Sequence, residues 1–183
     1  MPQRRPSPVD PDAEPGGVRL YLVRHAIAAE RGDEYPDDAT RPLMGKGIAR
    51  FREVVEALVA GGVEIDEILT SPAVRTRQTA ELLAEGFAVR PRLTNMHALA
   101  VQGQAQEVID GLARHAAKRS LALVGHEPLL GEVAARLIGS RRALTFKKGA
   151  VCAIDVPGLP VLAPGTLAWF LPPRLIRALR ASR

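Results

Sequence analysis

Four side chains that can hold an anion follow apolar, strand-like runs at three separate places in the chain. Arg24 and His25 follow the first run, Arg75 follows the second, and His126 follows the third. In an open α/β sheet, residues just beyond the strand ends meet in one crevice, so these side chains are predicted to share a pocket. Guanidinium groups are planar forks of N–H donors, which favours a phosphoryl group as the ligand.

A metal site is the alternative that a pair of histidines raises. Arginine always carries a positive charge, so Arg24 and Arg75 would repel a divalent cation. The sequence also shows no cluster of cysteine, aspartate or glutamate ligands beside the two histidines. We therefore expect neither a metal nor another cofactor in the pocket.

Four short blocks of sequence carry a family resemblance. They are RHA at 24–26, RPLMGKG at 41–47, SPAVRTRQTA at 71–80 and GHEP at 125–128. In this order they resemble the histidine phosphatase superfamily, whose hallmark is Arg-His-Gly, and within it the small SixA-type phosphohistidine phosphatases. The resemblance implies a phosphoglycerate mutase-like fold, which is a single three-layer α/β/α domain with a mostly parallel central sheet.

The same resemblance implies a role for each residue of the pocket. His25 is the nucleophile that attacks phosphorus and becomes transiently phosphorylated, and His126 contacts the phosphoryl oxygens together with Arg24, Arg41 and Arg75. The chemistry requires a neutral imidazole with a free lone pair, and the flanking arginines disfavour a second positive charge. Donors fixed around the oxygens stabilise the transition state as charge spreads over them.

The stretch between the second arginine and the second histidine departs from the wider family. Many members that cleave phosphate esters carry a Glu or Asp there, which protonates the leaving alkoxide. Residues 93–100 read LTNMHALA and hold no carboxylate. Glu127 and His97 are the remaining candidates for a general acid, although Glu127 can point away from the pocket and His97 can be an ordinary loop histidine.

Without a general acid, a phosphorylated imidazole is the easier substrate, because it is protonated on its own ring and leaves as neutral histidine. The expected function is a metal-independent phosphatase with a phosphohistidine intermediate, acting on phosphohistidine in proteins such as histidine phosphotransfer domains. Two alternatives stay open. One is a phosphatase for a small phosphate monoester, and the other is a noncatalytic module that binds phosphorylated partners.

Length and composition fit one ordinary globular domain of 183 residues, with 46% hydrophobic and 25% charged residues. Aromatic residues make up only 4%, which argues against stacking platforms for nucleic acid. No apolar stretch reaches membrane-spanning length, and the single cysteine, Cys152, cannot form an internal disulfide. We expect no nucleic-acid or membrane partner and a cytoplasmic location; the oligomeric state is open, and a monomer is compatible with the sequence.

Apolar periodicity predicts the elements that must position the pocket. The predicted strands cover 18–23, 65–70 and 121–124, and the predicted helices cover 46–60, 72 to about 85, 105–117 and 129–138. Strands that alternate with helices indicate a largely parallel sheet covered on both faces. Two later runs, at 150–156 and 166–171, predict a hairpin-like addition at the sheet edge.

The remaining segments are predicted to lie outside this framework. Residues 1–17 are rich in proline and indicate a disordered tail, which leaves 18–183 as the predicted histidine phosphatase domain. Residues 28–40 are polar and acidic, which is typical of a loop that serves either as a lid or as a solvated connection. Arginines recur every third residue from Arg174, which predicts a basic stripe on a terminal helix.

Overall fold

The computed structural model describes residues 17–181. The predicted Pro-rich tail therefore lies, apart from Gly17, outside the described residues. Within 17–181, no helix combines the length and the apolar character needed to cross a membrane.

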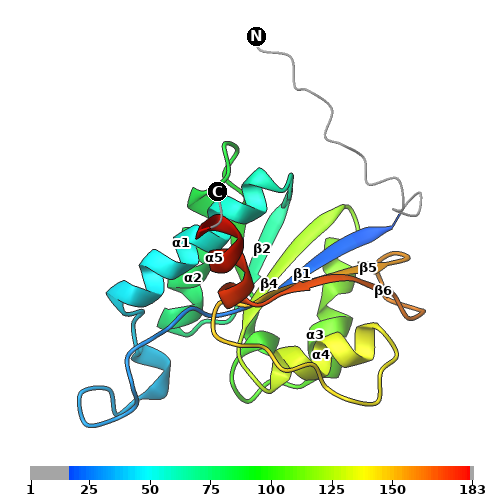
Figure 1. Cartoon of the computed structure of the whole chain (residues 1–183). Coiled ribbons are helices and arrows are strands. Elements are labelled where there is room, and N and C mark those ends of the chain that lie inside the picture. Colours follow the sequence, from blue (N-terminus) through cyan, green and yellow to red (C-terminus); the bar gives the residue numbers. More distant parts are fainter. Residues whose placement is uncertain (1–16, 182–183) are drawn as a thin grey trace.

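A six-stranded sheet forms the middle layer, in the order β3-β2-β4-β1-β5-β6 (Figure 1). The first four strands in this order are parallel, and the last two add antiparallel to one edge, as the sequence predicts. The strands are β1 (Val18–Arg24), β2 (Glu67–Thr70), β3 (Arg92–Asn95), β4 (Ser120–Gly125), β5 (Val151–Val156) and β6 (Thr166–Leu171).

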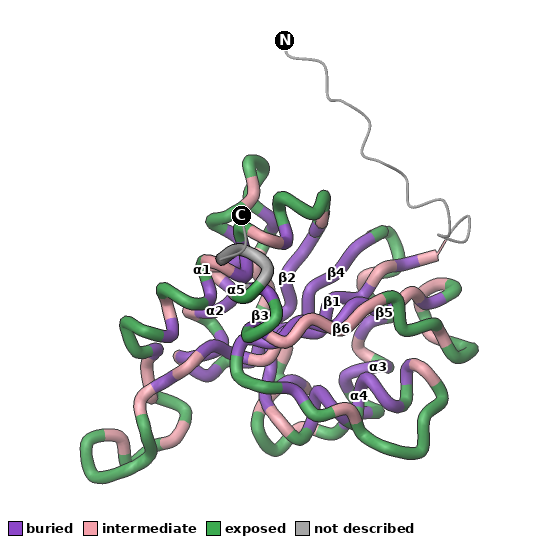
Figure 2. The backbone as a smooth tube through the Cα atoms, viewed as in Figure 1, coloured by how far each residue is buried: buried purple, intermediate pink, exposed green. Residues whose placement is uncertain are grey.

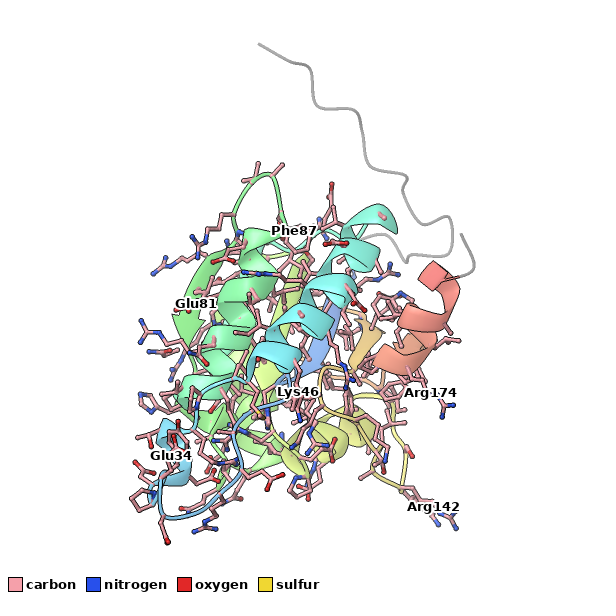
Figure 3. The ribbon with its side chains drawn as sticks, turned by 60° about the vertical axis from the view of Figure 1, so that its left-hand side comes forward. Glu34, Lys46, Glu81, Phe87, Arg142 and Arg174 are labelled. Atoms are coloured by element: carbon pink, nitrogen blue, oxygen red, sulfur yellow. The ribbon has the colours of Figure 1, made fainter. Side chains whose placement is uncertain are left out.

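Helices cover both faces of the sheet and complete three layers (Figure 1). The helices of the first face are α1 (Gly45–Ala60), α2 (Val74–Glu85) and α5 (Pro173–Ala181), and those of the second are α3 (Ala105–Gly111) and α4 (Leu129–Leu137). Lys46, at the start of α1, and Arg174, at the start of α5, are exposed, and Arg174 points away from the molecule (Figure 3). Arg174 is the only arginine of the predicted basic stripe whose side chain is among those described.

The core consists of two apolar clusters, one on each face, because successive side chains of a strand point to opposite sides. Leu20 and Leu22 of β1 belong to the cluster that contains Leu130 of α4. Tyr21 and Val23 belong to the other cluster, which contains side chains of α1 and α2. Figure 2 shows the resulting buried central strands. Burial on both faces explains why these strands read as continuous apolar runs.

Beyond shifts of one or two residues at strand ends, one strand and two helices differ from the sequence predictions. Strand β3 was not predicted, because it is a four-residue edge strand, RLTN, without a buried residue. The helix predicted for 105–117 changes at Gly111 into a 3₁₀ turn, η3 (Leu112–His115). Helix α2 begins at Val74 after an extended Ala73, so Pro72 precedes the helix instead of opening it.

Candidate active site

The four side chains predicted to share a pocket lie where parallel strands β1, β2 and β4 end. Arg24 is the last residue of β1 and pairs in register with Gly125 of β4. The next residue of each strand is a histidine, and His25 N–H donates to the Gly125 carbonyl at 3.1 Å. Arg75 lies in the first turn of α2, just beyond β2. The predicted convergence of these residues at one edge of the sheet therefore holds in the structure.

His25 is 5% exposed, and one hydrogen bond fixes its ring. Its Nδ1 lies 2.7 Å from the Ala26 carbonyl oxygen. Because a carbonyl only accepts, Nδ1 carries the proton and Nε2 keeps its lone pair. Burial, together with the charges of Arg75 and Arg24, lowers the pKa of His25 to about 4, against the bond to Ala26. The ring is therefore neutral at pH 7, with Nε2 as its nucleophilic atom.

The backbone around His25 is held by neighbouring segments. Gly149, with φ of 78°, donates its N–H to the carbonyls of Arg24 at 3.1 Å and His25 at 3.0 Å. On the other side, the Ala26 N–H donates to Thr79 Oγ1 of α2 at 3.0 Å. A positive φ favours glycine, so the loop before β5 can support the strand end only with this residue type at position 149.

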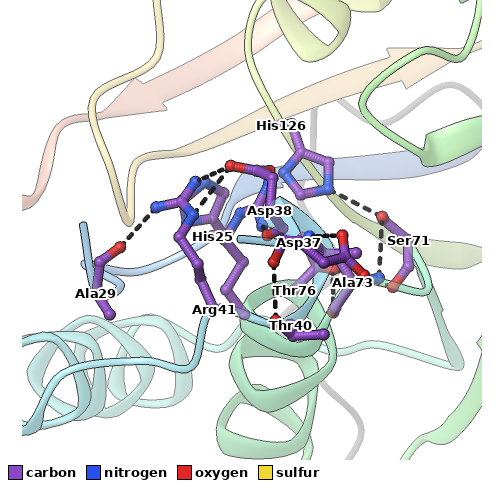
Figure 4. A network of polar contacts seen from close by, with 12 residues as sticks. His25, Ala29, Asp37, Asp38, Thr40, Arg41, Ser71, Ala73, Thr76 and His126 are labelled. Atoms are coloured by element: carbon purple, nitrogen blue, oxygen red, sulfur yellow. Dashed lines mark hydrogen bonds and ion pairs between the residues drawn. The ribbon is translucent and has the colours of Figure 1, made fainter. Parts of the chain in front are cut away.

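His126 is 3% exposed, and its ring centroid lies 5.3 Å from that of His25. Its Nε2 lies 2.9 Å from Ser71 Oγ, and the same oxygen accepts the Ala73 N–H at 3.5 Å (Figure 4). The buried Ser71 hydroxyl can donate its proton to Nε2, and in that tautomer the ring proton of His126 is on Nδ1. Burial, then the positive charge of Arg75, lowers the pKa of His126 to about 3.

Three buried nitrogen atoms of these residues have no hydrogen-bond partner in the described part of the chain. They are Arg24 Nε, Arg75 Nε and His126 Nδ1. Buried polar groups almost always have a hydrogen-bond partner. Three buried nitrogens without one, near the carboxyl ends of the parallel strands, therefore indicate a site for a ligand that accepts hydrogen bonds. A phosphoryl group, with several anionic oxygens, satisfies that requirement.

Arg41 reaches the site through a carboxylate that the sequence analysis did not single out. Its Nε and Nη2 donate to Asp38 Oδ1, at 2.9 and 2.7 Å, and its Nη1 donates to the Ala29 carbonyl at 2.6 Å (Figure 4). Asp38 Oδ2 accepts from Arg75 Nη2 at 2.6 Å. Asp38, in the 3₁₀ turn η1 (Asp38–Thr40), thus bridges two predicted phosphate ligands; its spacing of three residues from Arg41 is the only sequence signal for this.

The family model of the Histidine phosphatase superfamily (branch 1) matches residues 20–134 of this sequence. The chain belongs to the histidine phosphatase superfamily. Among curated relatives, the phosphohistidine phosphatase SixA of Escherichia coli (strain K12) is 25% identical over 172 residues, which cover 90% of this chain and 99% of SixA. The resemblance to SixA-type members is thereby confirmed, and the chain is a histidine-type phosphatase.

Solved structures share the fold of this histidine phosphatase. The protein histidine phosphatase SixA complexed with tungstate gives a TM-score of 0.78 at 24% identity, over 87% of this chain and 99% of that one. Phosphoglycerate mutase from Bacillus anthracis str. Sterne gives a TM-score of 0.63 at 14% identity, and the match covers 88% of this chain and 96% of that one. The predicted phosphoglycerate mutase-like fold is therefore confirmed.

The two candidates for a general acid lie in different surroundings. Glu127 Oε1 accepts the Phe146 N–H at 3.0 Å, while Arg24 Nη1 donates to the Phe146 carbonyl. Burial raises the pKa of Glu127, against the Phe146 bond and the charge of Arg24. His97 opens the 3₁₀ turn η2 (His97–Leu99) and is exposed. Glu127 and Arg24 thus contact the backbone of the same residue, Phe146, from two sides.

Acidification is expected to lower the free energy of unfolding as the pH falls from 6.5 toward 4. Both pocket histidines have a folded-state pKa below the ordinary value of 6.5, so the unfolded chain binds more protons in this window. Their contribution is complete above pH 6.5 and decreases as the pH falls. The measurement is urea unfolding at pH 7 and at pH 4.5. Between these two pH values, the free energy of unfolding should fall by about 2 kcal/mol less in His126→Asn than in the wild type. Equal losses in both proteins would contradict the buried, neutral state of His126.

Proposed function

We propose that this histidine phosphatase removes the phosphoryl group from phosphohistidine in proteins, without a metal, through a phosphohistidine intermediate on His25. One observation carries the proposal. A neutral His25 with a free Nε2 lies beside three unpartnered buried nitrogens, while the carboxylates of Glu127 and Asp38 accept hydrogen bonds from the Phe146 N–H and from arginine. Such a pocket binds and attacks phosphorus, but it offers no free acid for an alkoxide.

In the first step, His25 Nε2 attacks phosphorus and the substrate's P–N bond breaks. The electron pair of that bond returns to the substrate nitrogen, and the substrate ring leaves neutral because its other nitrogen carries a proton from solution. Phosphorylated His25 keeps its own proton on Nδ1, against the Ala26 carbonyl. In the second step, water attacks phosphorus and His25 leaves as a neutral ring by the same route. Neither ring needs a proton from a general acid.

The remaining pocket residues act on the phosphoryl oxygens. We assign Arg24, Arg75 and His126 to these oxygens, because their free nitrogens lie in the same pocket. Arg41 contributes its charge from the side of Asp38. Phosphoryl transfer places little covalent demand on the protein, so positioning and electrostatic stabilisation supply most of the rate.

Metal independence is supported by the charge of the pocket. Three guanidinium groups already supply the positive charge that a metal ion would otherwise bring to the phosphoryl oxygens. The name of the Escherichia coli relative supports phosphohistidine as the substrate class. As the partner we propose a phosphorylated protein of the histidine phosphotransfer type.

The test compares a phosphohistidine-containing peptide with a panel of phosphate monoesters, each with and without a chelator. We expect kcat/KM for the peptide to exceed that for every ester by about a hundredfold or more, since general acid catalysis contributes about that much to an alkoxide leaving group. The chelator should leave the rates unchanged. A higher kcat/KM for one ester would instead assign a small-molecule phosphatase, and a chelator-sensitive rate would contradict metal independence.

A further inference from the structure

Asp38 places a negative charge at the edge of a pocket that otherwise collects positive charge. Its side chain is 30% exposed, and its two oxygens contact Arg41 and Arg75. Its charge also acts on the buried ring of His126. In Figure 4 the carboxylate lies between the Arg41 guanidinium and the His126 ring. Apart from holding the two arginines, this carboxylate repels an anionic phosphoryl group, so its charge works against phosphate binding.

The contacts of Asp38 leave Arg75 with unused donors for a phosphoryl group. Arg75 uses Nη1 for the Asp38 backbone carbonyl and Nη2 for the carboxylate. A guanidinium has five N–H bonds, so about three of those of Arg75, the Nε–H among them, stay available. A carboxylate oxygen likewise accepts more than one hydrogen bond, so Asp38 can hold Arg41 and still accept another donor. The site can therefore present both a phosphate cradle and a free acceptor.

The leaving group decides whether this acceptor helps or hinders. An alkoxide or phenolate gains negative charge as its bond to phosphorus breaks, and a carboxylate nearby opposes that change. The imidazole of phosphohistidine instead carries an N–H when it leaves, and before cleavage that protonated ring is cationic. A carboxylate accepts this hydrogen bond and stabilises the protonated ring.

We propose that Asp38 selects the leaving group, by accepting a hydrogen bond from the ring N–H of a phosphorylated imidazole and by disfavouring leaving groups that gain negative charge. This inference rests on the proposed function and adds a specificity-determining residue to it. The proton on the ring comes from solution before cleavage. The P–N bond then breaks, its electron pair stays on the leaving nitrogen, and the N–H to Asp38 remains on the other ring nitrogen.

The test uses Asp38→Asn, which keeps the size of the side chain, with Asp37→Asn as the matched control. Asp37 is exposed, and its Oδ1 caps the same 3₁₀ turn by accepting the Ala39 N–H at 2.9 Å, a contact that asparagine can keep. Both variants remove one negative charge from the same loop. Only Asp38 contacts Arg41 and Arg75.

Asp38→Asn is expected to lower kcat/KM for a phosphohistidine peptide by about tenfold to a hundredfold, as for loss of a charge-assisted hydrogen bond. The rate on p-nitrophenyl phosphate should stay unchanged or rise, and Asp37→Asn should leave both rates unchanged. Inorganic phosphate should inhibit Asp38→Asn at least as strongly as the wild type, because the pocket loses a repulsive charge. That inhibition also shows that the arginines remain in place.

A pH profile distinguishes leaving-group selection by Asp38 from a purely structural role, in which Asp38 only holds Arg41 and Arg75 in place. Asp38 faces the guanidinium groups of Arg41 and Arg75 and the ring of His126, whose pKa of about 3 keeps it neutral above pH 4. The alkaline limb of kcat for the peptide therefore reports the substrate ring, and it should move to lower pH in Asp38→Asn by about one unit. Equal losses on peptide and ester, with an unmoved limb, would overturn the inference and leave the proposed function standing. If the wild type turned over esters but not the peptide, the proposed function itself would fall.

Discussion

Replacing His25 with asparagine is expected to lower the turnover of a phosphohistidine peptide by at least about 10⁴-fold, as for removal of a covalent nucleophile. Asparagine keeps polarity and similar bulk, but it has no Nε2 lone pair to attack phosphorus. The measurement is the release of inorganic phosphate under single-turnover conditions, with enzyme in excess over peptide.

The same variant provides its own control for folding. Because the oxygen-binding nitrogens belong to Arg24, Arg75 and His126, His25→Asn should still bind inorganic phosphate and should unfold cooperatively in urea. A variant that binds phosphate and yet turns over the peptide within tenfold of the wild type would show that His25 is not the nucleophile. His126, whose ring centroid lies 5.3 Å from that of His25, would then be the next residue to replace.

Arg75→Lys is expected to lower kcat by about 10²- to 10³-fold, with a smaller effect on KM. Lysine keeps the positive charge, but its ammonium group cannot reproduce the planar fork that holds Asp38 and leaves Nε for the phosphoryl group. The loss should fall mainly on kcat, because charge on the phosphoryl oxygens is redistributed as transfer proceeds.

Arg77→Lys is the matched control for that substitution. Arg77 lies two residues along the same helix, is 62% exposed, and pairs with Glu81 at 3.5 Å on the surface. An exposed ion pair of this kind contributes little, so kcat and KM should remain at wild-type values. Similar losses in Arg75→Lys and Arg77→Lys would indicate a general effect on α2 and would contradict a phosphate contact by Arg75.

The sequence predicts those parts of the fold that depend on long buried runs. Strands β1, β2 and β4 carry apolar side chains on both faces, and this pattern, followed by Arg24-His25 or His126, was enough to place one pocket. Strand β3 lies at the sheet edge with exposed and half-buried residues, so it has neither a run nor an alternation to reveal it. The loop of 28–40 has no periodicity at all.

The finer chemistry of the site depends on contacts between distant segments. The lone pair on His25 Nε2 follows from a hydrogen bond between the ring and the next residue, Ala26. The proton on His126 Nδ1 depends instead on Ser71, which is 55 residues away. Asp38 sits 37 residues from Arg75 and has no motif of its own. Glu127 is adjacent to His126 in sequence, yet its contact with Phe146 gives it a supporting role that adjacency alone does not predict.

The most direct test of the account is a rapid-quench experiment with a phosphohistidine peptide that carries a labelled phosphoryl group. Samples are quenched in base during the first turnover, and the protein is digested and analysed by mass spectrometry. The account predicts a label on His25 that appears before free phosphate and then decays, and that is missing in His25→Asn. Label on any other residue, or a first turnover that releases phosphate while the chain stays unlabelled throughout, would contradict it.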